Sequence, residues 1–418
     1  MKIISLLKLI AAIPLILIPF CILLYDTNVI FPFITLKAFA FHALILFSLF
    51  ITTIIFIFDH STQNLLWKLI NDKIIKIYII FISLISIISL FCYNPIYSFA
   101  GTIERLDGIY LYFSLTYLII LLNLIVNKNQ WKIIFINIIG VGLILFTFQY
   151  FQYSSGIFRP GSLINHPVFL SSYYLLCIGS MVVICRLYYS EKTKSINFII
   201  KLTAITIFCY GILISGTRSS GVALILTTIT ILYIERKKYL NFKSGFIVIF
   251  VILIFLYYIY SKDIKFRIFD VINDNSTINS RLINYKISFE SINPFAEGWS
   301  KFLFGWGWNN FYLAWDKYYI DQITLYDPLP FDKAHNFYID LLVASGICGL
   351  FIYLLFIKEI YKNIFLIADN QLKMGVLFIF TCHFIDLNFS FNSITNYISI
   401  QIILSYLIAL NIKTQNEI

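Results

Sequence analysis

Charged residues are scarce in this chain. They make up 12% of its 418 residues, whereas hydrophobic residues make up 60%, and the mean hydropathy is +0.86. Soluble domains usually contain about 25% charged residues, so this composition excludes an ordinary soluble protein and indicates that lipid surrounds most of the chain. The net charge of +10 does not predict nucleic-acid binding, because Lys and Arg stand in short clusters between apolar runs.

The chain also lacks the patterns of a disulfide framework or a zinc site. Its seven cysteines all fall within apolar runs, no two form a Cys-x-x-Cys pair, and no histidine stands at zinc-ligand spacing. We interpret them as packing residues and expect no metal and no cofactor. The first apolar run contains Lys8 and has no small-residue cleavage site before Asp26, so we expect a retained first span rather than a signal peptide.

Long apolar runs dominate the sequence instead. A spanning helix needs about 20 largely apolar residues, and about twelve runs approach or reach that length. They cover roughly 3–24, 36–58, 74–93, 109–126, 132–150, 168–186, 197–214, 219–234, 244–260, 337–357, 374–390 and 395–412. The sequence therefore predicts an all-α, polytopic membrane protein. We expect transmembrane helices over 1–260, one large and partly helical loop over 261–336, and the last transmembrane helices over 337–418.

The basic residues orient these spans. If the N-terminus is cytoplasmic and the spans alternate, most of the 31 Lys and Arg residues lie on the cytoplasmic side. The short outer loops then keep only Lys37, Arg105, Arg159 and Arg218. By the positive-inside rule, both termini are expected in the cytoplasm and the loop 261–336 on the opposite face. The membrane lipids themselves are then the first expected partners.

Four outer segments retain charged residues near the membrane, where charge is costly and therefore informative. They are 101–108 with Arg105, 159–167 with Arg159, the turn 215–221 with Arg218, and the long loop with Arg281 near its start and His335-Asn336 at its end. Small residues around Arg218 let backbone amides and the guanidinium approach an anion together. The alternative is an ordinary hairpin turn whose arginine reaches the lipid headgroups. Arg281 alone is more typical of a solvated loop residue than of a functional one.

Histidines near the outer ends of spans offer proton chemistry. A neutral imidazole at His335 can accept a proton from a hydroxyl near neutral pH, although an interfacial histidine without a role is the alternative. His383 and Asp386 are three residues apart and share a helix face, where a structural hydrogen bond is favoured over a proton relay. Glu104 and Arg105 can simply pair with each other, which contributes little if they are exposed.

Three segments form a recognisable pattern. They are Ser-Gly-Thr-Arg-Ser-Ser-Gly at 215–221, Phe-Gly-Trp-Gly-Trp-Asn-Asn-Phe at 304–311, and His335-Asn336 followed after nine residues by Gly346, two residues and Gly349. Together they resemble the O-antigen ligase and polymerase superfamily, membrane glycosyltransferases that use a polyprenyl-diphosphate-linked glycan as donor. The third segment is the most specific, because it fixes four positions at the predicted junction between loop and helix.

The resemblance implies a GT-C-like fold and a role for each matching residue. Arg218 and Arg281 would grip the donor diphosphate, and His335 would activate the acceptor hydroxyl. Asn336, Arg159 and Arg105 are expected to help bind the substrate. Two guanidiniums can stabilise a departing diphosphate without a metal, and in-line attack by the hydroxyl would invert the anomeric centre.

The resemblance leaves several family activities open. One large loop, without an Arg-x10-Gly spacing, favours an O-antigen ligase that transfers a glycan from undecaprenyl diphosphate to lipid A-core oligosaccharide. It would act at the periplasmic face of the bacterial inner membrane. O-antigen polymerase and protein O-oligosaccharyltransferase are alternatives with the same donor. A lipid-linked glycan transporter is the non-enzyme alternative, disfavoured because the notable charges gather at the outer ends of spans rather than at mid-membrane depth.

Overall fold

The chain is mostly helical in the residues that the structure, a computed structural model, describes. These are 2–102, 104–188, 194–234, 276–318 and 331–415. They form α-helices and two short 3-10 helices, and this part of the chain contains no β-strand, which confirms the all-α prediction for it. Lipid offers backbone amides no hydrogen-bonding partner, so a chain this apolar satisfies them within helices.

The helices follow one another with short connections. The first half contains α1 (Lys2–Leu17), η1 (Ile18–Leu23), α2 (Thr35–Phe58), α3 (His60–Asn71), α4 (Lys73–Leu90), α5 (Pro95–Ala100), α6 (Ile109–Ile125), α7 (Lys128–Ser154), η2 (Ser162–Ile164), α8 (Pro167–Leu187), α9 (Lys194–Ser215) and α10 (Arg218–Ile234). The second half contains α14 (Ser276–Ser291), α15 (Pro294–Glu297), α16 (Trp299–Phe304), α17 (Phe311–Tyr318), α18 (Phe337–Phe365), α19 (Asn370–Asp386) and α20 (Ile394–Gln415).

Polar N-caps define several of these starts. Asp72 accepts hydrogen bonds from the first amides of α4, and Asn127 forms a capping box with Gln130 at the start of α7. Such caps satisfy amides that have no partner within the helix. These capping residues therefore locate the first residue of a helix more accurately than the apolar run alone does.

Most predicted spans correspond to described helices. Seven helices are long and apolar enough to cross a membrane, namely α1 continued by η1, α2, α4, α7, α8, α18 and α20, while α6, α10 and the part of α9 from Ile199 are apolar but shorter. The run 374–390 overlaps α19. The run 244–260 and the boundary at 260/261 lie outside the described residues, so the count of about twelve spans stays a prediction. The short helices α3 and α5 were not predicted.

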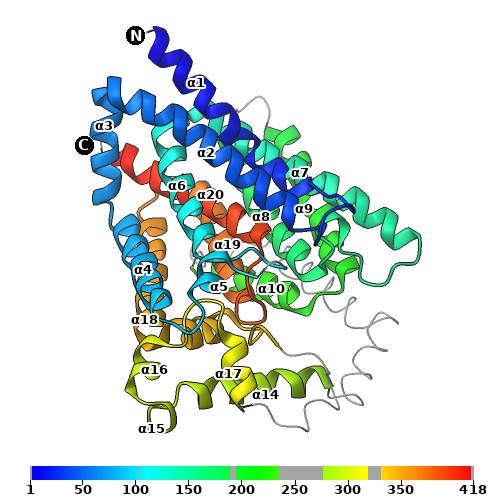
Figure 1. The fold of residues 1–418 in the computed structure, drawn as a ribbon. Coiled ribbons are helices and arrows are strands. Elements are labelled where there is room, and N and C mark those ends of the chain that lie inside the picture. Colours follow the sequence, from blue (N-terminus) through cyan, green and yellow to red (C-terminus); the bar gives the residue numbers. More distant parts are fainter. Residues whose placement is uncertain (1, 103, 189–193, 235–275, 319–330, 416–418) are drawn as a thin grey trace.

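The helices differ in how far they are enclosed. In α8 and α20, 78% and 83% of the apolar stretch is buried, against 28% in α2. Figure 1 shows α8 and α20 near the middle of the bundle and α2 along one side. The exposed Phe39, Leu46 and Phe50 of α2 suit a lipid-facing surface, because lipid tails are as apolar as these side chains.

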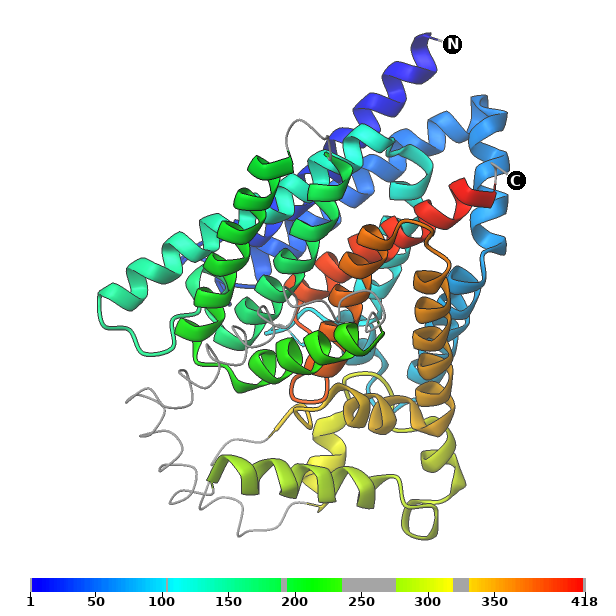
Figure 2. The same ribbon diagram turned by 180° about the vertical axis from the view of Figure 1, so that it is seen from behind.

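The two ends of the bundle are different. Both termini lie towards one end, and α14 to α17 lie together at the opposite end in both views (Figures 1 and 2). The helices α14 and α17 share a small hydrophobic core, which includes Ile287 of α14 and Phe311 and Trp315 of α17. Ala334, just before α18, and Val343 of α18 also belong to this core, so it packs against the start of α18. The described part of the predicted loop is therefore folded and partly helical.

A kink at Gly346 joins the outer helices to the bundle. Its φ of 62° and ψ of −168° interrupt α18, so the carbonyls of Val343 and Ala344 are open to accept hydrogen bonds from the amides of Trp306 and Gly307, at 2.8 and 3.0 Å. A side chain at Gly346 would stand 2.3 Å from the backbone of Leu303. The glycine therefore permits both the kink and the close approach of α16.

We predict that Gly346→Ala lowers the thermal unfolding midpoint of the purified protein in detergent. The substitution combines an unfavourable positive φ with a backbone clash, and a strained residue of this kind costs about 1–3 kcal/mol before the clash is counted. Gly140→Ala in α7 is the matched control, because nothing lies within 4 Å of the added methyl group. The control should leave the midpoint unchanged or raise it; equal midpoints for the two variants would contradict the proposed role of Gly346.

Candidate functional site

His335 lies at the end of the connection that leads into α18. Its backbone is left-handed, with a φ of 61°, and its Nδ1 stands 3.2 Å from the Lys333 carbonyl oxygen. The rings of Phe331 and Phe391 meet the imidazole edge to face, at centroid distances of 5.6 and 5.4 Å. The ring is therefore held between two aromatic side chains, with Nδ1 turned to the backbone.

The surroundings of His335 favour its neutral form. Burial is the main cause that lowers the pKa of His335 below its usual value of 6.5. The contact with the Lys333 carbonyl opposes it, the positive charges of Arg281 and Arg105 lower the pKa further, and Asp332 raises it slightly. A neutral imidazole is the form that can accept a proton. The structure thus brings His335, Arg281 on α14 and Arg105 within electrostatic reach of one another.

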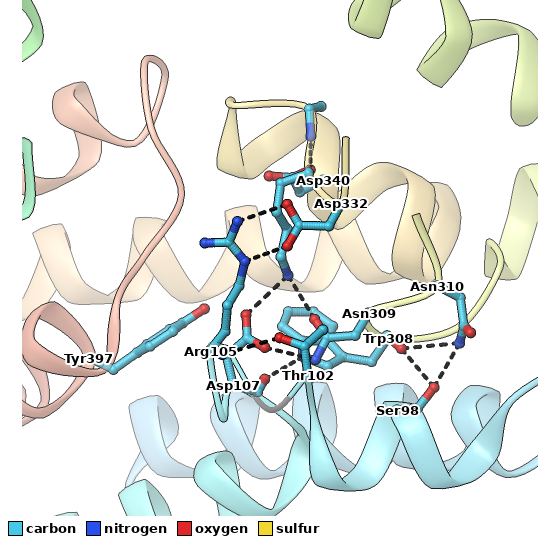
Figure 3. A network of polar contacts seen from close by, with 12 residues as sticks. Ser98, Thr102, Arg105, Asp107, Trp308, Asn309, Asn310, Asp332, Asp340 and Tyr397 are labelled. Atoms are coloured by element: carbon cyan, nitrogen blue, oxygen red, sulfur yellow. Dashed lines mark hydrogen bonds and ion pairs between the residues drawn. The ribbon is translucent and has the colours of Figure 1, made fainter. Parts of the chain in front are cut away.

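Arg105 is held by two partners. It forms a fork with Asp332, with 2.7 Å between Nη2 and Oδ1, and its guanidinium stacks over Phe391 at 4.1 Å from the ring centroid. Figure 3 shows the fork, which links residue 105 to a segment more than 200 residues away. Arg105 therefore pairs with Asp332 and not with its neighbour Glu104, the pairing considered from sequence.

A second ion pair lies beside this fork. Lys333 Nζ stands 3.1 Å from Asp107 Oδ2 and donates to Asn309 Oδ1 at 2.7 Å. Asn309 Nδ2 donates in turn to the other oxygen of Asp107 at 2.9 Å, and the indole of Trp308 donates to the Asp107 carbonyl. The segment 304–311 is thus connected to both 101–108 and the connection before α18 (Figure 3).

Arg159 joins the group through His166. Burial lowers the pKa of His166 to about 4, and the charges of Arg105, Arg159 and His335 add to the effect. The His166 ring stacks on Phe169 at 4.2 Å, and Phe169 meets Phe391, which also contacts His335. The start of α8 therefore forms another side of the same site.

Arg218 begins α10 and is exposed. The polar residues around it fix the turn to two neighbouring helices, since Thr217 donates to Ser171 of α8 at 2.7 Å and Ser220 to Asp386 of α19 at 3.4 Å. Asp386 also accepts a hydrogen bond from Ser172. Its partners are thus serines of neighbouring helices, and the hydrogen bond with His383 favoured from sequence stays a prediction. The turn is thus anchored to α8 and α19, whose outer ends also adjoin Phe391 and His335.

Asn336 is the N-cap residue of α18. Its side-chain oxygen accepts from the amides of Tyr338 and Ile339, at 3.0 and 3.3 Å, and so caps α18. This oxygen is committed to the helix start. A part in substrate binding stays a prediction for Asn336, as it does for Arg159 and Arg105.

One comparison with known proteins bears on the family. Residues 202–354 match the family model described as O-antigen ligase. This match supports the O-antigen ligase and polymerase superfamily for that part of the chain. The match covers Arg218, Arg281 and His335, and it includes the Phe-Gly-Trp-Gly-Trp-Asn-Asn-Phe segment. No curated protein matches the chain significantly.

The family match confirms the resemblance inferred from three segments. This superfamily contains glycosyltransferase-like enzymes. Sequence reasoning singled out the cations and His335 but missed their immediate partners. One sequence signal for these partners was the adjacent pair of opposite charges, Asp332 and Lys333, just before His335. Nothing in the sequence indicated Phe391, which Arg105 and His335 both contact. The seven cysteines, all of which lie in described residues, form no disulfide there.

We predict that His335 titrates below 6.5 and that Arg281→Gln raises its pKa. Diethyl pyrocarbonate modifies neutral imidazole, so the pH dependence of His335 modification, followed by mass spectrometry, gives the midpoint. Removal of the Arg281 charge takes away one cause of the lowered pKa. Lys286→Gln, which removes another positive charge from α14, is the control and should leave the midpoint in place. A midpoint above 6.5, or equal shifts in both variants, would contradict this electrostatic arrangement.

Proposed function

We propose that the protein is an O-antigen ligase that transfers a glycan en bloc from undecaprenyl diphosphate to lipid A-core oligosaccharide. The observation that carries this proposal is the gathering of a neutral-favouring histidine with several arginines at one end of the bundle. A base beside concentrated positive charge is what a hydroxyl nucleophile and a diphosphate leaving group require. The family match supports the same class of reaction.

In the proposed reaction, the acceptor hydroxyl attacks the anomeric carbon of the donor sugar while His335 takes its proton. The bond from that carbon to the diphosphate oxygen breaks, and the diphosphate departs with the bonding electrons. Arg281 and Arg218 stabilise the developing negative charge, so the reaction proceeds without a metal. Because attack and departure occur on opposite faces, the anomeric configuration is inverted.

We assign the site to the periplasmic face of the bacterial inner membrane, with both termini in the cytoplasm. Support comes from the position of the termini at the end opposite α14 to α17 (Figures 1 and 2) and from the excess of basic residues predicted on the cytoplasmic side. In this arrangement, a lipid-linked donor would present its diphosphate to His335 and Arg281 at headgroup level.

We predict that His335→Ala and Arg281→Ala each stop O-antigen attachment while the protein stays in the membrane. Loss of a general base costs about 10²–10⁴-fold in rate, and loss of a charge-stabilising group costs about 10²–10³-fold. Lipopolysaccharide ladders on gels and the amount of accumulated lipid-linked glycan measure the effect. His60→Ala on α3, an exposed histidine outside the site, is the control. Normal ladders in the His335 and Arg281 variants would refute the proposed roles, and the same comparison applies to Arg218→Ala.

The acceptor is tested by reconstitution. The purified protein receives one defined undecaprenyl-diphosphate-linked oligosaccharide together with lipid A-core, a pilin peptide or no second substrate. We expect a single transfer onto lipid A-core. A lengthened lipid-linked glycan would instead identify a polymerase, and a glycosylated peptide would identify a protein oligosaccharyltransferase.

A further inference from the structure

Two ion pairs of opposite polarity join the segment 101–108 to the residues before His335. In the first segment Arg105 is positive and Asp107 negative, while in the second Asp332 is negative and Lys333 positive. Arg105 pairs with Asp332 and Lys333 with Asp107. Each charge of one segment thus faces an opposite charge of the other, and the two ion pairs together hold the segments side by side.

The Asp107–Lys333 pair is the more enclosed of the two. Its side chains are 4% and 11% exposed, compared with 35% and 22% for Asp332 and Arg105. A buried ion pair often contributes no more to stability than an apolar pair of the same size, since both charges lose their hydration. What it does provide is one defined geometry, and Asn309 fixes that geometry further by bonding to both partners.

His335 needs such support because it occupies a left-handed conformation, which non-glycine residues adopt only when the surroundings enforce it. The chain is fixed on both sides of it. Before it, Lys333 is held by Asp107, and the amide of Ala334 donates to Asp340. After it, the amide of Phe337 donates to the Leu387 carbonyl at 2.9 Å. The direction of the imidazole therefore depends on where these anchors place the backbone.

We propose that Asp107 is a positioning residue for His335. It acts through Lys333, with Asn309 as the third member, and it does not touch the substrate. The 101–108 segment thus belongs to the catalytic arrangement through the backbone it holds. This inference rests on the function proposed above, in which His335 is the base.

The first test is Asp107→Asn, which removes the charge and keeps the size. Misplacement of a reacting group by about 1 Å can cost about 100-fold in rate, so we expect kcat to fall by about that factor while the KM for the lipid-linked donor stays within about threefold. Arg186→Gln is the control. It breaks an ion pair with Asp369 that joins the end of α8 to the start of α19, away from His335, and it should leave kcat unchanged.

The second test exchanges the charges. Asp107→Lys combined with Lys333→Asp restores an ion pair of the reverse polarity. The Asn309 side-chain amide can still bond to both partners, because it contains both a hydrogen-bond donor and an acceptor. We expect the kcat of the double variant to be at least tenfold higher than that of Asp107→Asn. Should Asp107→Asn fail to fold, this double variant alone decides, and a folded double variant as slow as His335→Ala would overturn the inference.

The third test separates positioning from a general structural effect. In a His335→Ala background there is no imidazole to aim, so adding Asp107→Asn should lower the residual rate by less than about twofold, whereas independent effects would multiply. An equal loss in both backgrounds, or a wild-type kcat for Asp107→Asn, overturns the positioning role. A wild-type kcat for His335→Ala would instead overturn the proposed function, so the two failures are distinguishable.

Discussion

Lipid cannot hydrogen-bond, and this constraint decides where the polar side chains of the chain can lie. Inside the bundle, two charged side chains illustrate how partners are provided. Lys37 is 1% exposed and donates to the Leu163 carbonyl at 2.8 Å, and Asp386 accepts from serines of two other helices. Most of the remaining charge is displaced to the ends of the helices. Charged residues are therefore concentrated at the ends of the bundle, because charge in the lipid core is costly. A site for an anion such as a diphosphate is most easily formed there.

The end of the bundle acquires its shape from a few backbone contacts. The kink at Gly346 turns α18 so that its first part lies beneath α16, and the freed carbonyls bind the amides of residues 306 and 307. This docking brings Asn309 to Asp107 and Lys333. The glycine, the tryptophan-rich segment and the histidine of the family pattern are thus neighbouring parts of one assembly, although each has a different role in it.

The sequence was informative wherever a single segment carries the signal. Apolar runs predicted helices, and three short segments, above all the fixed spacing from His335 to Gly346 and Gly349, indicated the family. The fork between Arg105 and Asp332 could not be predicted, because pairing across more than 200 residues depends on how the helices pack. The same is true of Phe391, an apolar residue among many, whose place beneath Arg105 and beside His335 follows only from the approach of α19 to α8.

The arginines of the site are not equivalent. The charge of Arg105 is balanced by Asp332, and its flat face is occupied by Phe391, so a diphosphate would have to compete with a carboxylate already in bidentate contact. Arg281 projects from α14 and acts on His335 mainly through its charge. Arg105 is therefore part of the frame that holds the connection before α18, through its contact with Asp332. The diphosphate contacts of Arg281 and Arg218 stay a proposal that rests on the family pattern.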